Sequence, residues 1–256
     1  MAIPIAEVIK YYNHSPKTLE IASLTPSYKA WLEAEKGFLL KIIPEKCKVL
    51  EIGAGNGRII SLLNDKKRNI TGIEIANLPF LKEAFKEEKN IKILKMDAHK
   101  LGFKDNSFDV CLIMYNTLGL IHNPLTVLKE CKRVTKKGGK VIISTYALDE
   151  KYVLKERIKF FKHLGHSITK MHGFDFEVNN SVVSHYFKES ELKQLFNVSD
   201  LNPKYYSLSK IGCVWVSTKH QIKSSSSFNP GKAVFFVKLQ SSLMIFLTKE
   251  LFILSL

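Results

Sequence analysis

The sequence predicts an α/β protein in which a mostly parallel sheet carries helices on both faces. Short apolar runs alternate with segments of helical apolar spacing over most of the chain, as in βαβ units. The run 108–114 is almost continuously apolar, which is typical of a central strand covered on both faces. A glycine-rich turn, 53–57, joins a buried strand, 47–52, to a segment of helical spacing. Such turns often bind nucleotide-like ligands.

Length and cysteine usage bound the class of protein. The 256 residues suffice for one large domain with appendages. Cysteines 47, 111, 131 and 213 form no C-x-x-C pair and show no metal-ligand spacing. We therefore expect reduced core cysteines and a cytoplasmic protein. The first residues carry Glu7 and no unbroken apolar run, so they do not predict a secretory signal.

The formal net charge of +15 rests mostly on lysine, because the chain has arginine only at positions 58, 68, 133 and 157. Such a charge favours an anionic partner. The lysines are spread over the whole sequence, which is more typical of a solvated surface than of a focused nucleic-acid stripe. Nucleic acid is therefore a possible but not a favoured partner.

The residues that precede the glycine-rich turn predict a helical cover. Apolar residues recur at helical spacing over 3–12 and again over 27–42. In the second segment Lys29, Glu33, Glu35 and Lys36 form the polar positions, while the aromatic positions include Tyr28 and Trp31.

The spacing of the glycines separates two ligand classes. A dinucleotide fingerprint, G-x-G-x-x-G, would place its third glycine at position 58, where the chain has Arg58. This argues against NAD. Three glycines in five residues instead indicate positive φ angles or a ligand that approaches the backbone closely. A glycine-rich turn with no ligand is the alternative.

The pattern Glu51-x-Gly53-x-Gly55-x-Gly57 resembles the first motif of the class I S-adenosylmethionine-dependent methyltransferases. The resemblance implies a Rossmann-like, seven-stranded, mostly parallel sheet with an antiparallel last strand. It also implies that the loop backbone lies under the methionine half of the cofactor. The residues assigned to the cofactor here are Glu51, Gly53, Ala54, Gly55 and Gly57.

The second strand, 69–75, ends beside an acid. Glu74 lies 21 residues after Gly53, close to the interval at which a parallel βαβ unit brings its next strand end beside the first. A carboxylate there can accept hydrogen bonds from both hydroxyls of a ribose. The resemblance assigns Glu74 this role, next to Ile75. A strand-end glutamate without a ligand is the alternative.

The next unit follows the same plan. Asn77 can cap a helix with Pro79 in its first turn, and 91–94 is the third strand. Asp97 lies 23 residues after Glu74. In the family an acid at this place holds the adenine amine and the next backbone N–H meets the ring, which assigns Asp97 and Ala98 to the adenine.

The loop after the central strand occupies the place where this fold has its reacting centre. It begins with Tyr115 and Asn116 and differs from the N-P-P-Y loop used on amide and base nitrogens. It looks like the loop of the small-molecule methyltransferases, so Tyr115 and Asn116 are candidate catalytic residues, and Tyr115 also a cofactor contact. His122 is either a general base or a residue that caps or packs against the helix 124–134.

Tyr28, Trp31 and Tyr146 are candidate substrate residues, together with Tyr11 and Tyr12. Simple packing is the alternative for each of those on the leading helices. Lys136 to Gly139 is expected to end the helix 124–134 with a glycine cap, and 140–145 to form the fifth strand, which Tyr146 follows.

The region after the fifth strand predicts a helix, 149–163, and then an irregular insertion. Histidines 163, 166 and 172 match no metal-ligand spacing, so no metal site is predicted. Strands 181–187 and 212–217, with a helix 189–196 between them, match the closing antiparallel hairpin of the methyltransferase fold.

These assignments predict three parts: a helical cover over 1–25, a methyltransferase domain over 26–219, and a serine-rich linker with an apolar appendage over 220–256. No apolar run in the appendage reaches the roughly 18 residues of a membrane span, so this segment predicts at most weak contact with a membrane surface. The expected activity is methyl transfer from S-adenosylmethionine to a small molecule. An RNA methyltransferase and a non-catalytic cofactor-binding module are the alternatives.

Overall fold

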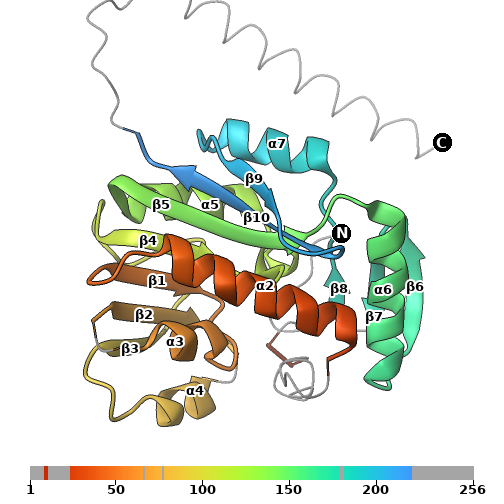
Figure 1. Cartoon of the computed structure of the whole chain (residues 1–256), viewed down its shortest axis with the longest axis horizontal. Helices are drawn as coiled ribbons and strands as arrows, with labels where there is room; N and C mark the ends of the chain where they lie inside the picture. Colours follow the sequence, from red (N-terminus) through yellow and green to blue (C-terminus); the bar gives the residue numbers. More distant parts are fainter. Residues whose placement is uncertain (1–8, 11–23, 66, 77, 179–181, 221–256) are drawn as a thin grey trace, which may run out of the picture. The chain divides into compact units, whose positions relative to one another are not determined.

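The computed structural model describes residues 9–10, 24–65, 67–76, 78–178 and 182–220. The expected helix 3–12 with Tyr11 and Tyr12 lies almost wholly outside these residues. The Asn77 cap and residues 221–256 of the predicted appendage also lie outside them. Within the described residues the chain forms a large sheet flanked by helices and a small second sheet (Figure 1).

The large sheet has seven strands among the described residues, in the order β3-β2-β1-β4-β5-β10-β9. They are β1 (Lys48–Ile52), β2 (Asn69–Glu74), β3 (Ile91–Lys95), β4 (Phe108–Ile113), β5 (Thr135–Tyr146), β9 (Lys204–Ser207) and β10 (Gly212–Thr218). The pairs among β1 to β5 are parallel, whereas β10 is antiparallel to both β5 and β9. The predicted mostly parallel sheet and the antiparallel orientation of 212–217 are thus confirmed.

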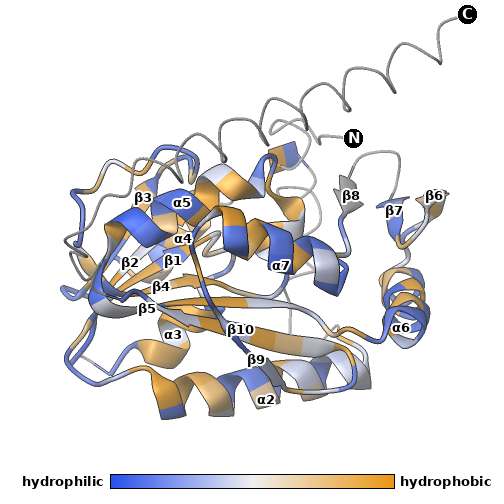
Figure 2. Ribbon diagram, turned by 90° about the horizontal axis from the view of Figure 1, so that it is seen from above, coloured by the Kyte–Doolittle hydropathy of each residue, from blue (hydrophilic) through white to orange (hydrophobic). Residues whose placement is uncertain are grey.

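Alternation along each strand divides the core between two faces of the sheet. Leu50 and Ile52 of β1 pack with α5 (Pro124–Val134) and α7 (Glu189–Val198) on one face. Val49 packs on the other face with residues of α2 (Pro26–Ile42), α3 (Arg58–Leu63) and α4 (Leu78–Ala84). Figure 2 shows α5 and α7 on one side of the sheet and α2 and α3 on the other. The two-residue period of a strand produces this division directly.

The end of α5 differs from the prediction. Thr135 is the C-cap residue in an extended conformation, and β5 begins at once, so 136–139 continues the strand instead of capping the helix. Gly138 does adopt a positive φ of 78°, and its N–H donates to the carbonyl of Lys219. Its partner is therefore the strand end of β10, which no local pattern could indicate.

The closing hairpin also differs from the prediction. It consists of β9 and β10, and β9 was not predicted as a strand. The segment 181–187 instead contributes β8 (Val182–Ser184) to a separate three-stranded sheet with β6 (Ile168–His172) and β7 (Asp175–Val178). This small sheet follows α6 (Glu150–His163) and lies beside it in Figure 1. The irregular insertion of the sequence is therefore an antiparallel subdomain.

Candidate functional site

The carboxyl ends of the parallel strands bring most of the predicted site residues to one edge of the sheet. Ile52 at the end of β1 is in register with Ile73 of β2 and Ile113 of β4. The glycine-rich turn, Glu74 and the loop after β4 therefore begin at neighbouring positions. Tyr146 ends β5 at the same edge.

The glycine-rich turn is shaped by positive φ angles. Gly53, Gly55 and Gly57 have φ values of 71°, 56° and 81°, which confirms the first of the two explanations for these glycines. A Cβ on Gly53 would lie 2.5 Å from Cγ2 of Thr117, and one on Gly57 would lie 2.9 Å from Cδ1 of Leu81. The protein itself therefore requires glycine at both positions, whether or not a ligand is bound.

Glu74 ties the turn to the second strand. Its Oε2 accepts a hydrogen bond from the N–H of Gly55 at 2.8 Å. Its Oε1 accepts from the N–H groups of Ile75 and Ala76 at 2.7 and 2.9 Å. Each carboxylate oxygen has two acceptor sites, so three of the four are used and one, on Oε2, remains for a ligand hydroxyl. Glu74 thus shapes the loop and can still accept a hydrogen bond from one ribose hydroxyl.

Glu51 lies beneath the turn and is almost completely buried, with 3% of its surface exposed. Burial, partly opposed by Arg58 and reinforced by Glu35 and Glu74, raises the pKa of the Glu51 carboxyl well above its usual range. Its Oε2 has no hydrogen-bond partner among the described residues. A buried polar atom in this state is costly, so the site retains an unsatisfied polar group in the strand that leads into the glycine-rich turn.

Asp97 follows β3 and is exposed, with 53% of its side chain accessible. Its Oδ1 accepts from the backbone N–H of His99 at 2.9 Å and contacts Nδ1 of the same residue at 2.6 Å. Partial desolvation opposes the shift, but these bonds lower the pKa of Asp97, and they raise the pKa of His99 against the same opposing effect. Asp97 and the half-buried Ala98 remain accessible to a ligand at the end of β3.

The loop after β4 holds two residues in the left-handed region. Tyr115 and Asn116 have φ values of 53° and 57°, which are uncommon for residues other than glycine and are worth noting at a site. The amide of Asn116 donates to the backbone carbonyl of His185 at 3.2 Å. Tyr115 and Asn116 are therefore fixed in position at the place predicted for the reacting centre.

His122 is exposed at the end of this loop. The cap of α5 is Asn123, whose side chain accepts from the N–H of Thr126, so the expectation that His122 caps this helix is wrong. Its ring centroid lies 6.4 Å from that of His99, and its backbone carbonyl contacts Nε2 of His99.

The predicted substrate residues come together in an aromatic cluster. The ring of Trp31 lies 5.0 Å from Tyr115 and 5.3 Å from Tyr146 between centroids, and the hydroxyls of Tyr28 and Tyr146 are 3.2 Å apart. Tyr28, Trp31 and Tyr146 are all buried. Burial, followed by the nearby tyrosines, raises the pKa of Tyr28 well above its usual range. We call Tyr28, Trp31 and Tyr146 the aromatic wall. Tyr28 and Trp31 contact the ring of Tyr115 in the loop after β4.

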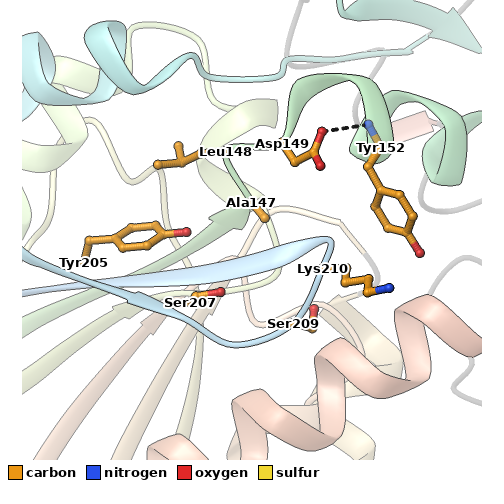
Figure 3. A pocket seen from close by; sticks show the side chains of 8 residues that line it. All are labelled: Ala147, Leu148, Asp149, Tyr152, Tyr205, Ser207, Ser209 and Lys210. Atoms are coloured by element: carbon orange, nitrogen blue, oxygen red, sulfur yellow. Dashed lines mark hydrogen bonds between the residues drawn. The ribbon is translucent and has the colours of Figure 1, made fainter.

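A pocket of about 370 Å³ lies between the residues that follow β5 and the hairpin of β9 and β10 (Figure 3). It is lined by Ala147, Leu148, Asp149, Tyr152, Tyr205, Ser207, Ser209 and Lys210. Asp149 caps α6 by accepting from the N–H of Tyr152 at 3.1 Å, and Nζ of Lys210 lies 5.7 Å from the centre of the Tyr152 ring. The volume falls within the range of small-molecule sites.

Two charged residues of the site were not predicted as functional. Glu35 of α2 is completely buried and pairs with Arg58 at the start of α3. The sequence held a signal for this burial, because Trp31, Glu35 and Leu39 follow one another at intervals of four and so share one helix face. The charged residue type alone predicts a position on the polar face for Glu35, whereas the structure buries it.

His185 is a second residue that the sequence did not single out. Its Nδ1 lies 2.6 Å from Oδ2 of Asp175, and its Nε2 lies 3.0 Å from both carboxylate oxygens of Glu191. Desolvation opposes protonation, but the hydrogen bonds and charges of the two acids outweigh it and raise the pKa of His185 to about 9. The protonated His185 thus links Asp175 of β7 to Glu191 of α7. Its backbone carbonyl accepts from the side-chain amide of Asn116.

This geometry predicts a pH dependence of stability. Because the pKa of His185 is higher in the folded state than its ordinary value near 6.5, the stabilisation is complete below about pH 6.5 and is lost as pH rises through about 9. We expect the urea midpoint of the wild type to fall between pH 6.5 and 9 by more than that of His185→Gln. Parallel curves for the two proteins would contradict the assignment.

The hydrogen-bonding groups at this edge of the sheet fit S-adenosylmethionine. The acids Glu51 and Glu74 lie at the carboxyl ends of β1 and β2, and Asp97 follows β3. The buried Oε2 of Glu51 lacks a partner among the described residues. Acids suit the hydroxyls, the amines and the positive charge of this cofactor. The order of the acids along the sheet agrees with the order expected from the resemblance.

Comparison with known proteins supports the same identification. Residues 50–143 match the model of a methyltransferase domain. The chain is 38% identical over 146 residues to an uncharacterized protein of Methanocaldococcus jannaschii, which covers 53% of this chain and 62% of that protein. It is 32% identical over 115 residues to the demethylmenaquinone methyltransferase of Thermotoga maritima, covering 44% and 48% of the two chains. The match therefore spans less than two thirds of either curated relative.

The fold has close structural neighbours. A crystal structure of a protein from Pyrococcus horikoshii matches with a TM-score of 0.64 and 22% identity, over 82% of this chain and 98% of that one. This likeness shows the fold. With the methyltransferase-domain match over the glycine-rich turn, β2, β3, β4 and most of β5, residues 50–143 form a methyltransferase domain within the fold of the class I S-adenosylmethionine-dependent methyltransferases.

Proposed function

We propose that the protein transfers a methyl group from S-adenosylmethionine to a small-molecule acceptor. The observation that carries the proposal is the set of acids at the carboxyl edge, with the unsatisfied Glu51 oxygen beneath the glycine-rich turn. The turn and Glu51 would hold the methionine part, Glu74 the ribose and Asp97 the adenine. When bound, the cofactor supplies an electrophilic methyl group on a sulfonium, so the leaving group needs no acid.

The work left to the protein is positioning and exclusion of water. Tyr115 and Asn116 would orient the acceptor, because their backbone is fixed by hydrogen bonds to Ser144 from both N–H groups. Tyr28, Trp31 and Tyr146 would shield the reacting atoms from solvent. These aromatic side chains are already packed together and buried, so the wall needs no assembly when the acceptor binds.

A small acceptor is supported by the size of the pocket between the residues that follow β5 and the hairpin of β9 and β10, about 370 Å³, which suits a small ligand. The relative named demethylmenaquinone methyltransferase supports the same class. No helix in the described part of the chain is long and apolar enough to cross a membrane.

The decisive experiment screens a metabolite extract for acceptor-dependent release of S-adenosylhomocysteine. The proposal expects release that requires both the protein and a fraction of the extract. Binding of S-adenosylmethionine with no methylated product in any fraction would favour a non-catalytic binding module. Methylation that appears only when RNA is added would favour an RNA methyltransferase.

His122 is proposed as general base for an acceptor that must lose a proton, because histidine is the side chain whose ordinary pKa is nearest neutrality. We expect His122→Ala to lower turnover by roughly 100-fold and to leave cofactor binding unchanged. His163→Ala, an exposed position near the end of α6, is the matched control. Full turnover of His122→Ala from acid to alkaline pH would exclude the role.

A further inference from the structure

A buried ionic group connects three elements around the site. Glu35 is 0% exposed in the middle of α2. Its Oε1 accepts from Nη2 of Arg58 at 2.5 Å, and its Oε2 accepts from Oγ of Ser144 at 2.5 Å. Arg58 begins α3 immediately after the glycine-rich turn, and Ser144 lies near the carboxyl end of β5.

The same group reaches the loop after β4. Oγ of Ser144 accepts from the N–H of Tyr115 at 3.2 Å. The guanidinium of Arg58 lies 5.6 Å from the centre of the Tyr115 ring, within the range of a cation–π contact. Glu35 therefore contacts, through one residue each, both of the loops that flank the proposed cofactor and acceptor.

The burial of the Glu35 carboxylate explains why it requires these partners. A buried carboxylate is stable only when a cation and hydrogen bonds compensate it, and Glu35 receives both. The neighbouring carboxyl of Glu51 has a pKa raised first of all by burial. Arg58 forms its ion pair with Glu35. The pair is therefore the electrostatic link between helix α2 and the glycine-rich turn.

We propose that Glu35 is a positioning residue whose ion pair with Arg58 latches helix α2 over the glycine-rich turn, while its bond with Ser144 fixes the backbone at Tyr115. The same helix carries Tyr28 and Trp31 of the aromatic wall. Release of the latch would therefore open the wall and the cofactor loop together. The contacts that hold α2 do not depend on the proposed function. The identity of the ligand that α2 would cover, S-adenosylmethionine, does rest on it.

Hydrogen exchange measured by mass spectrometry tests the latch without any ligand. In Glu35→Gln we expect the amides of α2 to exchange at least tenfold faster than in the wild type, with β4 unchanged. Glu33→Gln is the matched control, because Glu33 lies on the same helix with 73% of its side chain exposed. Equal protection of α2 in Glu35→Gln and Glu33→Gln would overturn the proposal.

Three further variants cover the case in which Glu35→Gln also loosens β4. Glu35→Asp keeps the charge but shortens the side chain, and we expect it to speed exchange in α2 alone. The double variant Glu35→Gln/Arg58→Gln removes both charges and should exchange more slowly in α2 than Arg58→Gln, which leaves a buried carboxylate uncompensated. Wild-type protection in Glu35→Asp together with additive effects in the double variant would overturn the latch.

Ligand kinetics separate the latch from the proposed function. With S-adenosylhomocysteine as the probe, Glu35→Gln should release the ligand at least tenfold faster, with little change in association. Faster exchange of α2 with no binding of the probe to the wild type would keep the latch and reject the cofactor. Binding with unchanged release in Glu35→Gln would mean that α2 does not cover the ligand, and would overturn the positioning role.

Discussion

Replacing Glu74 by alanine should weaken the binding of S-adenosylmethionine at least tenfold. The substitution removes the carboxylate proposed for the ribose, and loss of such charge-assisted hydrogen bonds typically costs about 1.5–3 kcal/mol. It also frees the N–H groups of Gly55, Ile75 and Ala76, which the carboxylate holds at 2.7–2.9 Å. The glycine-rich turn is therefore expected to lose order as well as its ligand contact.

Isothermal titration of wild type, Glu74→Ala and Glu74→Gln with the same cofactor measures the effect. Glu74→Gln keeps a carbonyl acceptor for the loop but loses the charge, so its affinity should fall between the other two. Glu83→Ala serves as control, because Glu83 lies on α4 with 70% of its side chain exposed. Wild-type affinity in Glu74→Ala would remove Glu74 from the site.

Replacing Gly212 by alanine should destabilise the fold by about 1–3 kcal/mol, the usual cost of overpacking a core. Gly212 pairs with Tyr146 at the start of β10, and a Cβ there would overlap the indole ring of Trp31. Trp31 is 0% exposed, so it can yield only if α2 or the strand moves. The single added methyl group should therefore displace the cover helix.

Urea unfolding and tryptophan fluorescence measure this effect. We expect a lower unfolding midpoint for Gly212→Ala and a shifted emission from Trp31, with Trp215→Phe as background to isolate it. Gly37→Ala is the control on α2, because a Cβ at Gly37 meets nothing within 4 Å. An alanine within a helix should be neutral or stabilising by up to about 1 kcal/mol. Equal midpoints for the two variants would show that Trp31 is not tightly held.

The aromatic wall and the ion pair of Glu35 both hold helix α2 in place, and this affects how a cofactor leaves the glycine-rich turn. Tyr28 and Trp31 are buried against Tyr115 and Tyr146 in the structure described here, and α2 is held by Glu35. Release of a bound cofactor from the turn is therefore expected to require movement of α2.

The sequence by itself determined the order of the parallel units and the edge at which the site forms. Apolar periodicity predicted β1, β2 and β4, and the glycines predicted the turn, because these signals are local in the chain. The acids Glu74 and Asp97 were predicted from position, since parallel strands return their carboxyl ends to one edge. The resemblance to a family supplied the ligand, which periodicity does not specify.

The tertiary structure alone decided the features that depend on distant partners. The closing strand β9 pairs with β10, and β5 begins early because Gly138 bonds to Lys219, 81 residues later. The buried state of Glu35 depends on Arg58 and Ser144, and the charge of His185 depends on Asp175 and Glu191. From sequence alone, a charged side chain is expected at the solvent-exposed surface. Its burial becomes possible only when folding brings compensating partners to it.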